Sequence, residues 1–305
     1  MIKCLRIEET DPFLNLATEE FLLKHSNDEY FLLWQNAESI IVGRHQNIFA
    51  EVNVNFAESN NIPIARRLSG GGTVFHDLGN INLTLIRNRE SINFDELTAL
   101  MLSALLLWDI HVTVDSRYAL FTDRRKFSGC AGAVHHGRTL HHATLLFNSH
   151  IDRMFQALAP SIPECYSGKA PISNRSRVIN LSELIQDIDV IRFSELLFQH
   201  ISSKLSAVPV SYKSLDLCAI RIFETNYRNW DAIYGRSPRF VFHKYLYNNV
   251  LIEIAIERGR VVSVLLPEAS NVSYSPHLSA IRNILCNIIG MTWNEVLRKL
   301  PAEWV

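Results

Sequence analysis

Three consecutive glycines after a predicted strand are the feature that most restricts how this chain can fold. Gly70, Gly71 and Gly72 follow residues 62–66, an apolar segment typical of a β-strand. Glycine lets the backbone turn tightly and direct several N–H groups toward one anion. The run therefore predicts a cradle for a phosphate or an acyl phosphate, and a flexible hairpin on the surface is the alternative.

Two arginines come just before the glycines. Arg66 and Arg67 are neighbours at the end of the predicted strand, where successive side chains point in opposite directions. Only one of them can therefore face a ligand on the loop. The segment matches neither the Walker phosphate loop nor the dinucleotide-binding glycine pattern, so a nucleotide would be held here in another way.

The composition excludes several classes of protein. A chain of 305 residues with 48% apolar and 20% charged side chains indicates a globular protein with one large domain and a smaller one. Its 30 basic and 31 acidic side chains give a net charge of −1, which argues against broad electrostatic binding to nucleic acid or to a membrane surface. The most apolar stretch, residues 97–108, is too short to span a bilayer.

The cysteines and the first residues indicate a reducing compartment. The five cysteines are widely scattered and form no C-x-x-C pair, so we expect neither a disulfide framework nor a zinc ribbon. The first ten residues alternate in charge and lack the apolar segment of a signal peptide. We therefore expect a cytoplasmic protein.

Hydrophobic periodicity predicts an α+β fold with a mixed, largely antiparallel sheet. A helix is expected from Pro12 to about Lys24 with Asp11 as N-cap, and another over residues 94–107, capped by Asn93 with Glu96 placed for a capping box. Strands are expected at residues 30–34, 39–42, 62–66, 80–87, 112–115, 118–122, 126–134 and 141–148. Within the fourth of these, the alternation places Ile81, Leu83 and Leu85 on one face and Asn82 and Thr84 on the other.

The pattern weakens between residues 202 and 217, which predicts a link between domains. We expect a larger domain over residues 1–215 and a small α+β domain over residues 216–305. The small domain should contain a hairpin that turns at Arg258 and Gly259, followed by helices over residues 276–289 and 292–300.

Three other segments contain residues suited to chemistry. Lys126, after Arg124 and Arg125, could hold a phosphate and a carboxylate together, although three consecutive charges more often form a solvated hairpin tip. Of His141 and His142, adjacent residues on a strand, one should line a pocket, and zinc is not expected because no nearby side chain completes a tetrahedral set. Residues 168–181 form a polar, basic loop that could be a mobile lid or an ordinary connection.

Taken together and in this order, these segments resemble the lipoate–protein ligase family. The matching runs are Asn15-Leu-Ala-Thr-Glu-Glu20, Arg66-Arg-Leu-Ser-Gly-Gly-Gly-Thr-Val-Phe-His-Asp-Leu-Gly-Asn80, Lys126-Phe-Ser-Gly-Cys-Ala131, His141-His-Ala-Thr-Leu-Leu146 and Ser173-Asn-Arg-Ser-Arg-Val-Ile-Asn-Leu181. The resemblance implies a catalytic domain of the biotin/lipoyl-ligase fold followed by a small accessory domain. It implies that lipoate and MgATP give lipoyl-adenylate and pyrophosphate, and that the lipoyl group then passes to a lysine of a carrier domain. Such carriers belong to 2-oxoacid dehydrogenase complexes or are the H protein of glycine cleavage.

The resemblance also implies roles for individual residues. Lys126 would be catalytic and would bridge the adenylate phosphate and the lipoyl carboxyl. ATP and the adenylate would be bound by Arg67, Ser69, Gly70, Gly71, Gly72, Thr73, Val74, Phe75, Asn80 and Lys126. The lipoate pocket would be lined by Glu20, His76, Gly129, Ala131, His142 and Thr144, and the lid would carry Lys169, Arg175 and Arg177. No protein side chain is expected to be a metal ligand.

The chain departs from the family pattern just before Lys126. Where the family usually reads Gly-Arg-Asn-Asp-Leu, residues 116–120 read Ser-Arg-Tyr-Ala-Leu, so Ala119 replaces an aspartate that normally contacts the nucleotide or its metal. Two alternatives follow. One is an acyltransferase of the same superfamily that uses Cys165 as nucleophile and needs no ATP, and the other is a homologue that binds lipoate or a carrier without catalysis.

Overall fold

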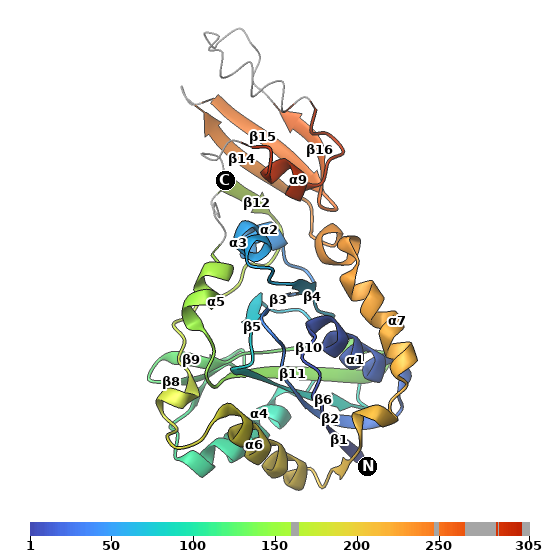
Figure 1. Ribbon diagram of the computed structural model, residues 1–305, viewed down its shortest axis with the longest axis vertical. Helices are drawn as coiled ribbons and strands as arrows, with labels where there is room; N and C mark the ends of the chain where they lie inside the picture. Colours follow the sequence, from blue (N-terminus) through green and yellow to red (C-terminus); the bar gives the residue numbers. More distant parts are fainter. Residues whose placement is uncertain (160–164, 247–249, 266–284, 286, 301–305) are drawn as a thin grey trace.

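The computed structural model describes residues 1–159, 165–246, 250–265, 285 and 287–300. Most of the chain forms a broad body built on one large sheet, and a small sheet lies at one end of the long axis (Figure 1). The N-terminus lies at the opposite end (Figure 1).

The large sheet has six strands in the order β10-β11-β6-β2-β1-β13. Their bounds are β1 Ile2–Arg6, β2 Glu29–Trp34, β6 Asn80–Arg87, β10 Cys130–His135, β11 Arg138–Leu146 and β13 Val208–Pro209. The pairs β10·β11, β11·β6 and β6·β2 are antiparallel, whereas β1 runs parallel to both β2 and β13. The predicted mixed, largely antiparallel α+β fold is confirmed.

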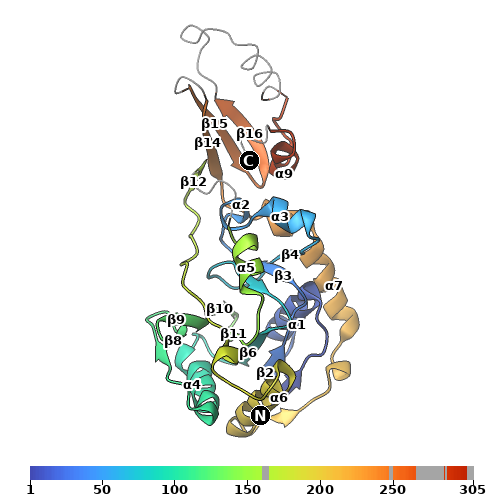
Figure 2. The same ribbon diagram turned by 60° about the vertical axis from the view of Figure 1, so that its left-hand side comes forward.

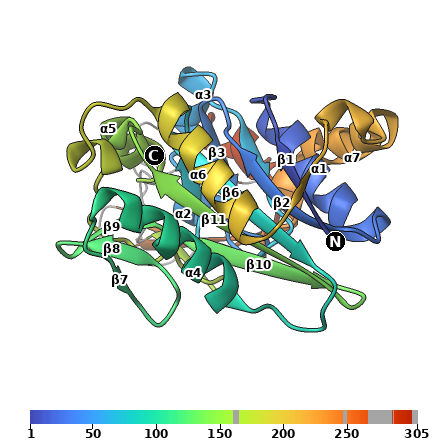
Figure 3. The same ribbon diagram turned by 90° about the horizontal axis from the view of Figure 1, so that it is seen from below.

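Helices cover one face of this sheet. Helices α4 (Phe94–Leu105) and α6 (Val190–Lys204) lie side by side across it (Figure 3). The apolar side chains of the predicted alternation, Ile81, Leu83 and Leu85, pack in the same buried cluster as these helices. The polar side chains of β6 therefore face the other side, where the cavities described below lie.

Helix α1 (Pro12–His25) lies on that other side. Asp11 is its N-cap and accepts hydrogen bonds from the backbone N–H groups of Phe13 and Leu14, as expected. Beside it stands a three-stranded sheet in the order β4-β3-β5, with bounds β3 Ser39–Val42, β4 Ile64–Arg66 and β5 Val74–His76. The three-stranded sheet fixes both ends of the glycine loop, because the loop begins at the end of β4 and ends at the start of β5.

The segment predicted as one strand over residues 126–134 is two strands in two sheets, so that prediction was wrong. Strand β9 (Arg125–Ser128) pairs with β8 (Leu120–Thr122) and through it with β7 (Thr113–Val114), whereas β10 belongs to the large sheet. The change occurs at Gly129, whose backbone N–H and carbonyl group both bond Thr144 instead of continuing a ladder.

The capping box at Glu96 is also absent. Asn93 caps α4 by accepting from the N–H of Asp95, and the Glu96 carboxylate instead bonds Arg87 and pairs with Arg89 at 2.8 Å. Two guanidinium groups within reach compete more strongly for the carboxylate than one backbone N–H does.

The remaining helices connect these parts. They are α2 Ile48–Glu51, α3 Val54–Ser59, η1 Leu106–Trp108, α5 Ile151–Ala157, η3 Leu181–Glu183, η4 Tyr212–Ser214, α7 Leu217–Arg228, the π-helical turn η5 Asp231–Gly235 and α9 Trp293–Leu297. None of the helices in the described ranges is long and apolar enough to cross a membrane.

The small sheet at the end of the molecule has the order β12-β14-β15-β16, all antiparallel. Its strands are β12 Tyr166–Gly168, β14 Phe240–Leu246, β15 Val250–Glu257 and β16 Arg260–Leu265, and the last two form the predicted hairpin. The helix expected over residues 276–289 lies largely outside the described residues. The expected helix over residues 292–300 is observed as the shorter α9, with Thr292 as N-cap.

Two contacts cross the predicted division at residues 215 and 216. Strand β12, from the middle of the chain, pairs with β14 of the small sheet, and the segment after it runs back along the body (Figure 2). Helix α7 packs along α1 rather than on the small sheet (Figure 1). The division into two domains stays a prediction.

Candidate active site

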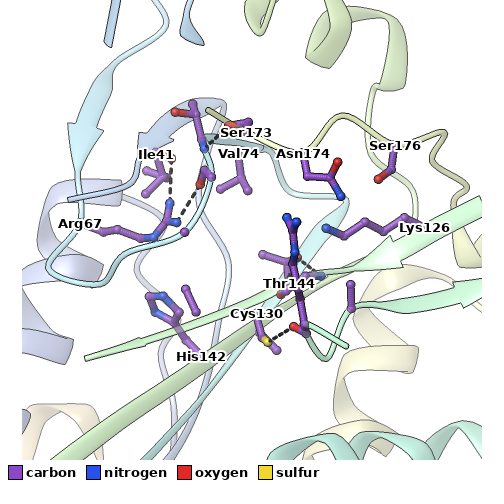
Figure 4. A pocket seen from close by; sticks show the side chains of 18 of the residues that line it. Ile41, Arg67, Val74, Lys126, Cys130, His142, Thr144, Ser173, Asn174 and Ser176 are labelled. Atoms are coloured by element: carbon purple, nitrogen blue, oxygen red, sulfur yellow. Dashed lines mark hydrogen bonds between the residues drawn. The ribbon is translucent and has the colours of Figure 1, made fainter. Parts of the chain in front are cut away.

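The glycine loop is held in shape from behind by Arg67. This buried guanidinium donates hydrogen bonds to the carbonyl oxygens of Ile41 (3.0 Å), Gly70 (2.6 Å) and Gly72 (2.7 Å), and its Nε donates to Ser69 Oγ (2.9 Å). Because Arg67 occupies the loop's carbonyl groups, it fixes the loop's backbone conformation. Figure 4 shows Arg67 beside Ile41 at one wall of the cavity.

Arg66 points away from the loop, as the strand alternation predicts. It donates to the carbonyl oxygens of Gly43 (3.0 Å), Gln46 (2.8 Å) and Ile233 (2.8 Å), so it ties the loop after β3 to the η5 turn. Burial lowers the pKa of both arginines to about 10, and each remains charged at neutral pH.

Glycine is required at position 71. Gly71 has φ +82°, and an added Cβ would lie 2.9 Å from Arg67 Nη2 and 3.2 Å from Ala131 Cβ. At Gly70, by contrast, an added Cβ would meet no atom of the described residues within 4 Å. Within the triplet, position 71 therefore requires glycine, whereas position 70 has room for a side chain.

Two cavities adjoin the loop and meet at Lys126. The first chamber, of about 350 Å³, runs from Lys126 and the glycine loop inward to Trp34, Leu16 and His142. The second chamber, of about 270 Å³, has a mostly apolar wall. Both are lined by Thr73, Val74, Lys126, Gly129, Thr144, Ser173, Asn174 and Ser176.

Lys126 stands at this junction. Its backbone is fixed by hydrogen bonds with Arg177 (2.7 Å) and Ile179 (3.0 Å), and its side chain extends into the cavity toward Asn174 (Figure 4). Burial lowers the pKa of Lys126. Among the described residues, its ammonium group has no hydrogen-bond partner, which leaves it available for an anion.

The inner end of the first chamber contains a fixed histidine. His142 Nε2 lies 2.7 Å from Ser69 Oγ, and Nδ1 lies 3.2 Å from Glu19 Oε1. The same Glu19 oxygen accepts a hydrogen bond from Thr84 Oγ1, whose oxygen in turn accepts from Trp34 Nε1. The network locks the imidazole and the indole into the chamber wall.

The other histidine of the pair faces the opposite side of the sheet. His141 packs against the Phe94 ring at 4.7 Å, and burial lowers its pKa to about 3. Only His142 of the pair lines the first chamber, because neighbouring side chains of β11 point to opposite faces. His76 lines the first chamber, and burial lowers its pKa to about 3 as well, so it is neutral there.

The second chamber contains an unpaired acceptor. Asn80 is fully buried, its Nδ2 donates to Asn82 Oδ1 at 3.1 Å, and its own Oδ1 has no hydrogen-bond partner among the described residues. Around it the wall is formed by Phe75, Leu146, Met154, Phe155 and Leu158. A flat, largely apolar group with a hydrogen-bond donor would satisfy this site.

The expected lid segment closes against the glycine loop. Ser173 Oγ accepts hydrogen bonds from the backbone N–H of Thr73 (2.9 Å) and from Gln46 Nε2 (2.9 Å), and Ser173 N–H donates to Glu51 Oε1 (3.0 Å). Figure 4 shows Ser173, Asn174 and Ser176 along one side of the cavity. The predicted basic residues contribute less: Arg175 lines only the second chamber, Arg177 gives its carbonyl oxygen to Lys126, and Lys169 is exposed and lines neither chamber.

Glu20 is not placed in the pocket wall, so the structure corrects that prediction. It accepts a hydrogen bond from Tyr227 of α7 (2.6 Å) and pairs with Lys24, whereas Glu19 lies behind His142. Glu19 comes three residues after Leu16, which lines the first chamber, and side chains at that spacing share a helix face. This signal is present in the sequence but does not decide between the two carboxylates.

The other predicted site residues divide into two groups. Those that line a chamber are Arg67, Gly71, Gly72, Thr73, Val74, Phe75, His76, Asn80, Lys126, Gly129, Ala131, His142 and Thr144. Ser69 and Gly70 line neither chamber and support the loop. Sequence reasoning missed Trp34, Gln46 and Asp115, whose local patterns carry no signal of a site. Arg117 and Ser173 also line the first chamber, and the sequence indicated them only as members of longer segments.

Two features bear on cofactors and nucleophiles. No group of three metal-ligating side chains occurs within the part of the chain that is described.

Cys165 lines neither chamber, and burial raises the pKa of Cys130, which does line the first chamber, to about 11. A thiol with a raised pKa is a poor nucleophile at neutral pH.

Comparison with known proteins identifies the family. Residues 11–202 match the family model "Lipoyl protein ligase A/B catalytic domain". The chain is 36% identical to lipoate-protein ligase LplJ of Bacillus subtilis over 265 residues, which cover 82% of this chain and 80% of that protein.

Solved structures share the fold. LipL1 of P. falciparum in complex with lipoate superposes with a TM-score of 0.68 at 22% identity, covering 99% of this chain and 95% of that chain. A lipoate-protein ligase A bound with ATP gives a TM-score of 0.62 at 23% identity and covers 77% of this chain and 100% of that chain. The chain belongs to the lipoyl protein ligase A/B catalytic-domain family.

Proposed function

We propose that this protein is an ATP-dependent lipoate–protein ligase. It activates lipoate with ATP to lipoyl-AMP and pyrophosphate, and then transfers the lipoyl group to a lysine of a carrier domain. The observation that carries the proposal is the pair of chambers that meet at Lys126. With the acid in one chamber and the nucleotide in the other, the carboxylate and the α-phosphate would lie beside the Lys126 ammonium group. The names of the family and of the Bacillus subtilis relative support the same activity.

The first chamber suits an acid with an apolar tail. Leu16, Trp34 and Ile41 line it at the inner end, and Lys126 stands at its junction with the second chamber. An aliphatic chain with its ring inward would leave its carboxylate at the ammonium group. This orientation buries the apolar part of lipoate and pairs its charge.

The second chamber suits the adenine of ATP. Its apolar wall accepts the faces of the ring, and Asn80 Oδ1 accepts a hydrogen bond from the exocyclic amine. With the base held there, the phosphates reach the glycine loop, where backbone N–H groups such as that of Thr73 are donors. A phosphate oxygen that binds this N–H must displace Ser173 Oγ.

The chemistry follows from this placement. A carboxylate oxygen of lipoate attacks the α-phosphorus, the bond to the β-phosphate oxygen breaks, and pyrophosphate leaves. The Lys126 ammonium group stabilises the negative charge on the phosphorus oxygens as it grows. In the second step the carrier's lysine amine attacks the acyl carbon, an amide forms, and AMP leaves.

Magnesium would travel with the nucleotide. Since the described residues offer no group of three ligating side chains, the phosphates and water would hold most of its coordination sites, which is usual for Mg²⁺. The ion would supply positive charge that balances the triphosphate.

The acceptor is a lysine of a lipoyl carrier domain. We propose the carrier domains of 2-oxoacid dehydrogenase complexes or the H protein of glycine cleavage as the class of partner, and a cytoplasmic location. Neither nucleic acid nor membrane is part of the proposed activity.

The test is lipoate-dependent exchange between ATP and labelled pyrophosphate, followed by mass spectrometry of a purified carrier domain. The ligase predicts exchange and a carrier mass increased by one lipoyl group. Acyl transfer without exchange, abolished in Cys165→Ser, would establish the transferase instead. Lipoate binding without either activity would establish a binding protein.

A further inference from the structure

The turn between β7 and β8 brings one carboxylate into the wall of the first chamber. Asp115 is the one aspartate or glutamate among the described residues that line this chamber. The other charged side chains there are basic: Arg67, Arg117 and Lys126. In the proposed function this chamber binds the carboxylate of lipoate and the phosphates of ATP. The negative charge of Asp115 would repel both, so its presence in the wall requires an explanation.

The turn fixes this carboxylate in place. Asp115 Oδ1 accepts hydrogen bonds from the backbone N–H groups of Arg117 (2.9 Å) and Ala119 (2.8 Å). The turn is closed by Asp115 N–H to the carbonyl oxygen of Ala119 (3.1 Å) and by Tyr118 N–H to that of Asp115 (3.0 Å). With Oδ1 occupied, Oδ2 has no hydrogen-bond partner in the described part of the chain and is free to act on a neighbour.

That neighbour is Lys126. Asp115 is the carboxylate whose charge favours the protonated form of Lys126, against burial and the positive charge of Arg117. The Asp115 carboxylate and the Lys126 ammonium group form no ion pair within 4 Å. The ammonium group can therefore bind the reactants while the negative charge of Asp115 still stabilises it electrostatically. Cys130 of β10 also faces Lys126, and Glu51 and Arg175 line the second chamber with it.

We propose that Asp115 is a positioning residue for Lys126: its carboxylate, fixed by the 115–119 turn in the wall of the chamber that Lys126 also lines, stabilises the ammonium form of this half-buried lysine before the reactants arrive. This inference rests on the proposed function, in which Lys126 acts only when it is protonated. It assigns a role to a residue whose local sequence shows none, four positions before Ala119.

Asp115→Asn separates charge from structure. The amide oxygen of asparagine accepts the same two N–H bonds, so the turn is kept while the negative charge is lost. Asp123→Asn is the matched control, since Asp123 is an exposed residue of the β8–β9 turn that lines neither chamber. Its φ of 47° is tolerated by asparagine.

The direct measurement is the titration of Lys126 without any substrate. Competitive labelling with acetic anhydride over a range of pH, read by peptide mass spectrometry, gives the pKa of this one lysine. We expect that pKa to fall by about 0.5 to 1 pH unit in Asp115→Asn and to be unchanged in Asp123→Asn. An unchanged or raised value in Asp115→Asn overturns the proposal.

Catalysis supplies the second readout. The alkaline limit of pyrophosphate exchange marks the loss of the Lys126 proton, so in Asp115→Asn it should move to lower pH by the same amount as the labelling pKa. If the alkaline limit of exchange in Asp115→Asn equals that of the wild type while the labelling pKa of Lys126 falls, the role of Asp115 in the reaction is overturned. If the wild type shows no exchange, the proposed function fails, whereas the labelling result still decides whether Asp115 controls Lys126.

Discussion

Ser173 Oγ accepts the backbone N–H of Thr73 at 2.9 Å, although the two residues are 100 positions apart in the chain. The contact places a hydroxyl oxygen where the glycine loop would offer a donor to a phosphate. Gln46 connects the same two residues, because its Nε2 donates to Ser173 Oγ and its Oε1 accepts from Thr73 Oγ1 at 2.7 Å. The lid segment thus provides the acceptor for this N–H group of the glycine loop.

Removing this hydroxyl should favour the nucleotide. In Ser173→Ala the Thr73 N–H is free, and one competing hydrogen bond, worth about 1 kcal/mol, no longer has to be broken. We expect the KM for ATP in pyrophosphate exchange to fall about fivefold, with kcat within twofold of the wild type. Ser167→Ala, an exposed site on β12, is the control. A raised KM would mean that Ser173 itself binds the nucleotide.

Lys126→Ala should abolish adenylate formation without unfolding the protein. The change removes a charge-assisted contact of about 1.5–3 kcal/mol, together with stabilisation that grows in the transition state, so exchange should fall by at least about 100-fold. Thermal unfolding should be nearly unchanged because the ammonium group makes no hydrogen bond to any residue that the structure describes. Arg125→Ala, which removes an exposed ion pair with Glu183, should keep near-normal exchange. Near-normal turnover in Lys126→Ala would remove Lys126 from the mechanism.

Gly71→Ala and Gly70→Ala should differ although they are neighbours. At position 71 the new methyl group meets Arg67 and Ala131 at a positive φ, so we expect a loss of about 1–3 kcal/mol in the free energy of unfolding and a large loss of exchange. At position 70 the methyl group meets no atom of the described part of the chain within 4 Å, so stability and activity should stay close to the wild type. Urea denaturation and exchange assays compare the two. Equal effects would contradict the assigned loop geometry.

Asn80 should control the choice of base. If its free Oδ1 accepts the exocyclic amine of adenine, inosine triphosphate, which has a carbonyl oxygen there, should be used at least about tenfold less well than ATP. Asn80→Ala should use both nucleotides poorly and with little preference. The measurement is kcat/KM for exchange with each nucleotide. A wild type that does not discriminate would place the base elsewhere.

His141 should make the fold sensitive to acid. Its pKa is about 3 in the folded protein and near 6.5 when unfolded, so the unfolded state binds a proton first as the pH falls. The stabilisation is complete above pH 6.5 and is lost between pH 6.5 and 3, which amounts to about 2 kcal/mol between pH 7 and 5. His141→Phe should reduce the pH dependence of the unfolding free energy by that amount. An unchanged dependence in urea titrations at the two pH values would contradict this account.

Local pattern was sufficient for much of the fold. The alternation in residues 80–87 assigned both faces of β6, since a strand with one apolar and one polar face can be buried in only one way. The same alternation predicted that Arg66 and Arg67 point in opposite directions, and likewise His141 and His142. The N-cap at Asp11 was predictable because capping depends only on neighbouring residues.

Local pattern failed where several partners compete. Helix α1 is buried around most of its surface, between the large sheet and α7, so both Glu19 and Glu20 lie against protein and periodicity alone does not decide which one faces the cavity. Glu96 was expected to cap its own helix but bonds arginines of another segment. In both cases the outcome depends on residues that are distant in the sequence.

The sequence by itself determined the glycine loop, its arginine, the lysine opposite and the family to which they belong. Only the tertiary structure decided that Ser173 closes on Thr73, that β12 joins the small sheet and that Asp115 faces the chamber of Lys126. The physical reason is that glycine conformation, strand alternation and capping are short-range effects. The pairing of buried polar groups depends instead on which segments meet when the chain folds.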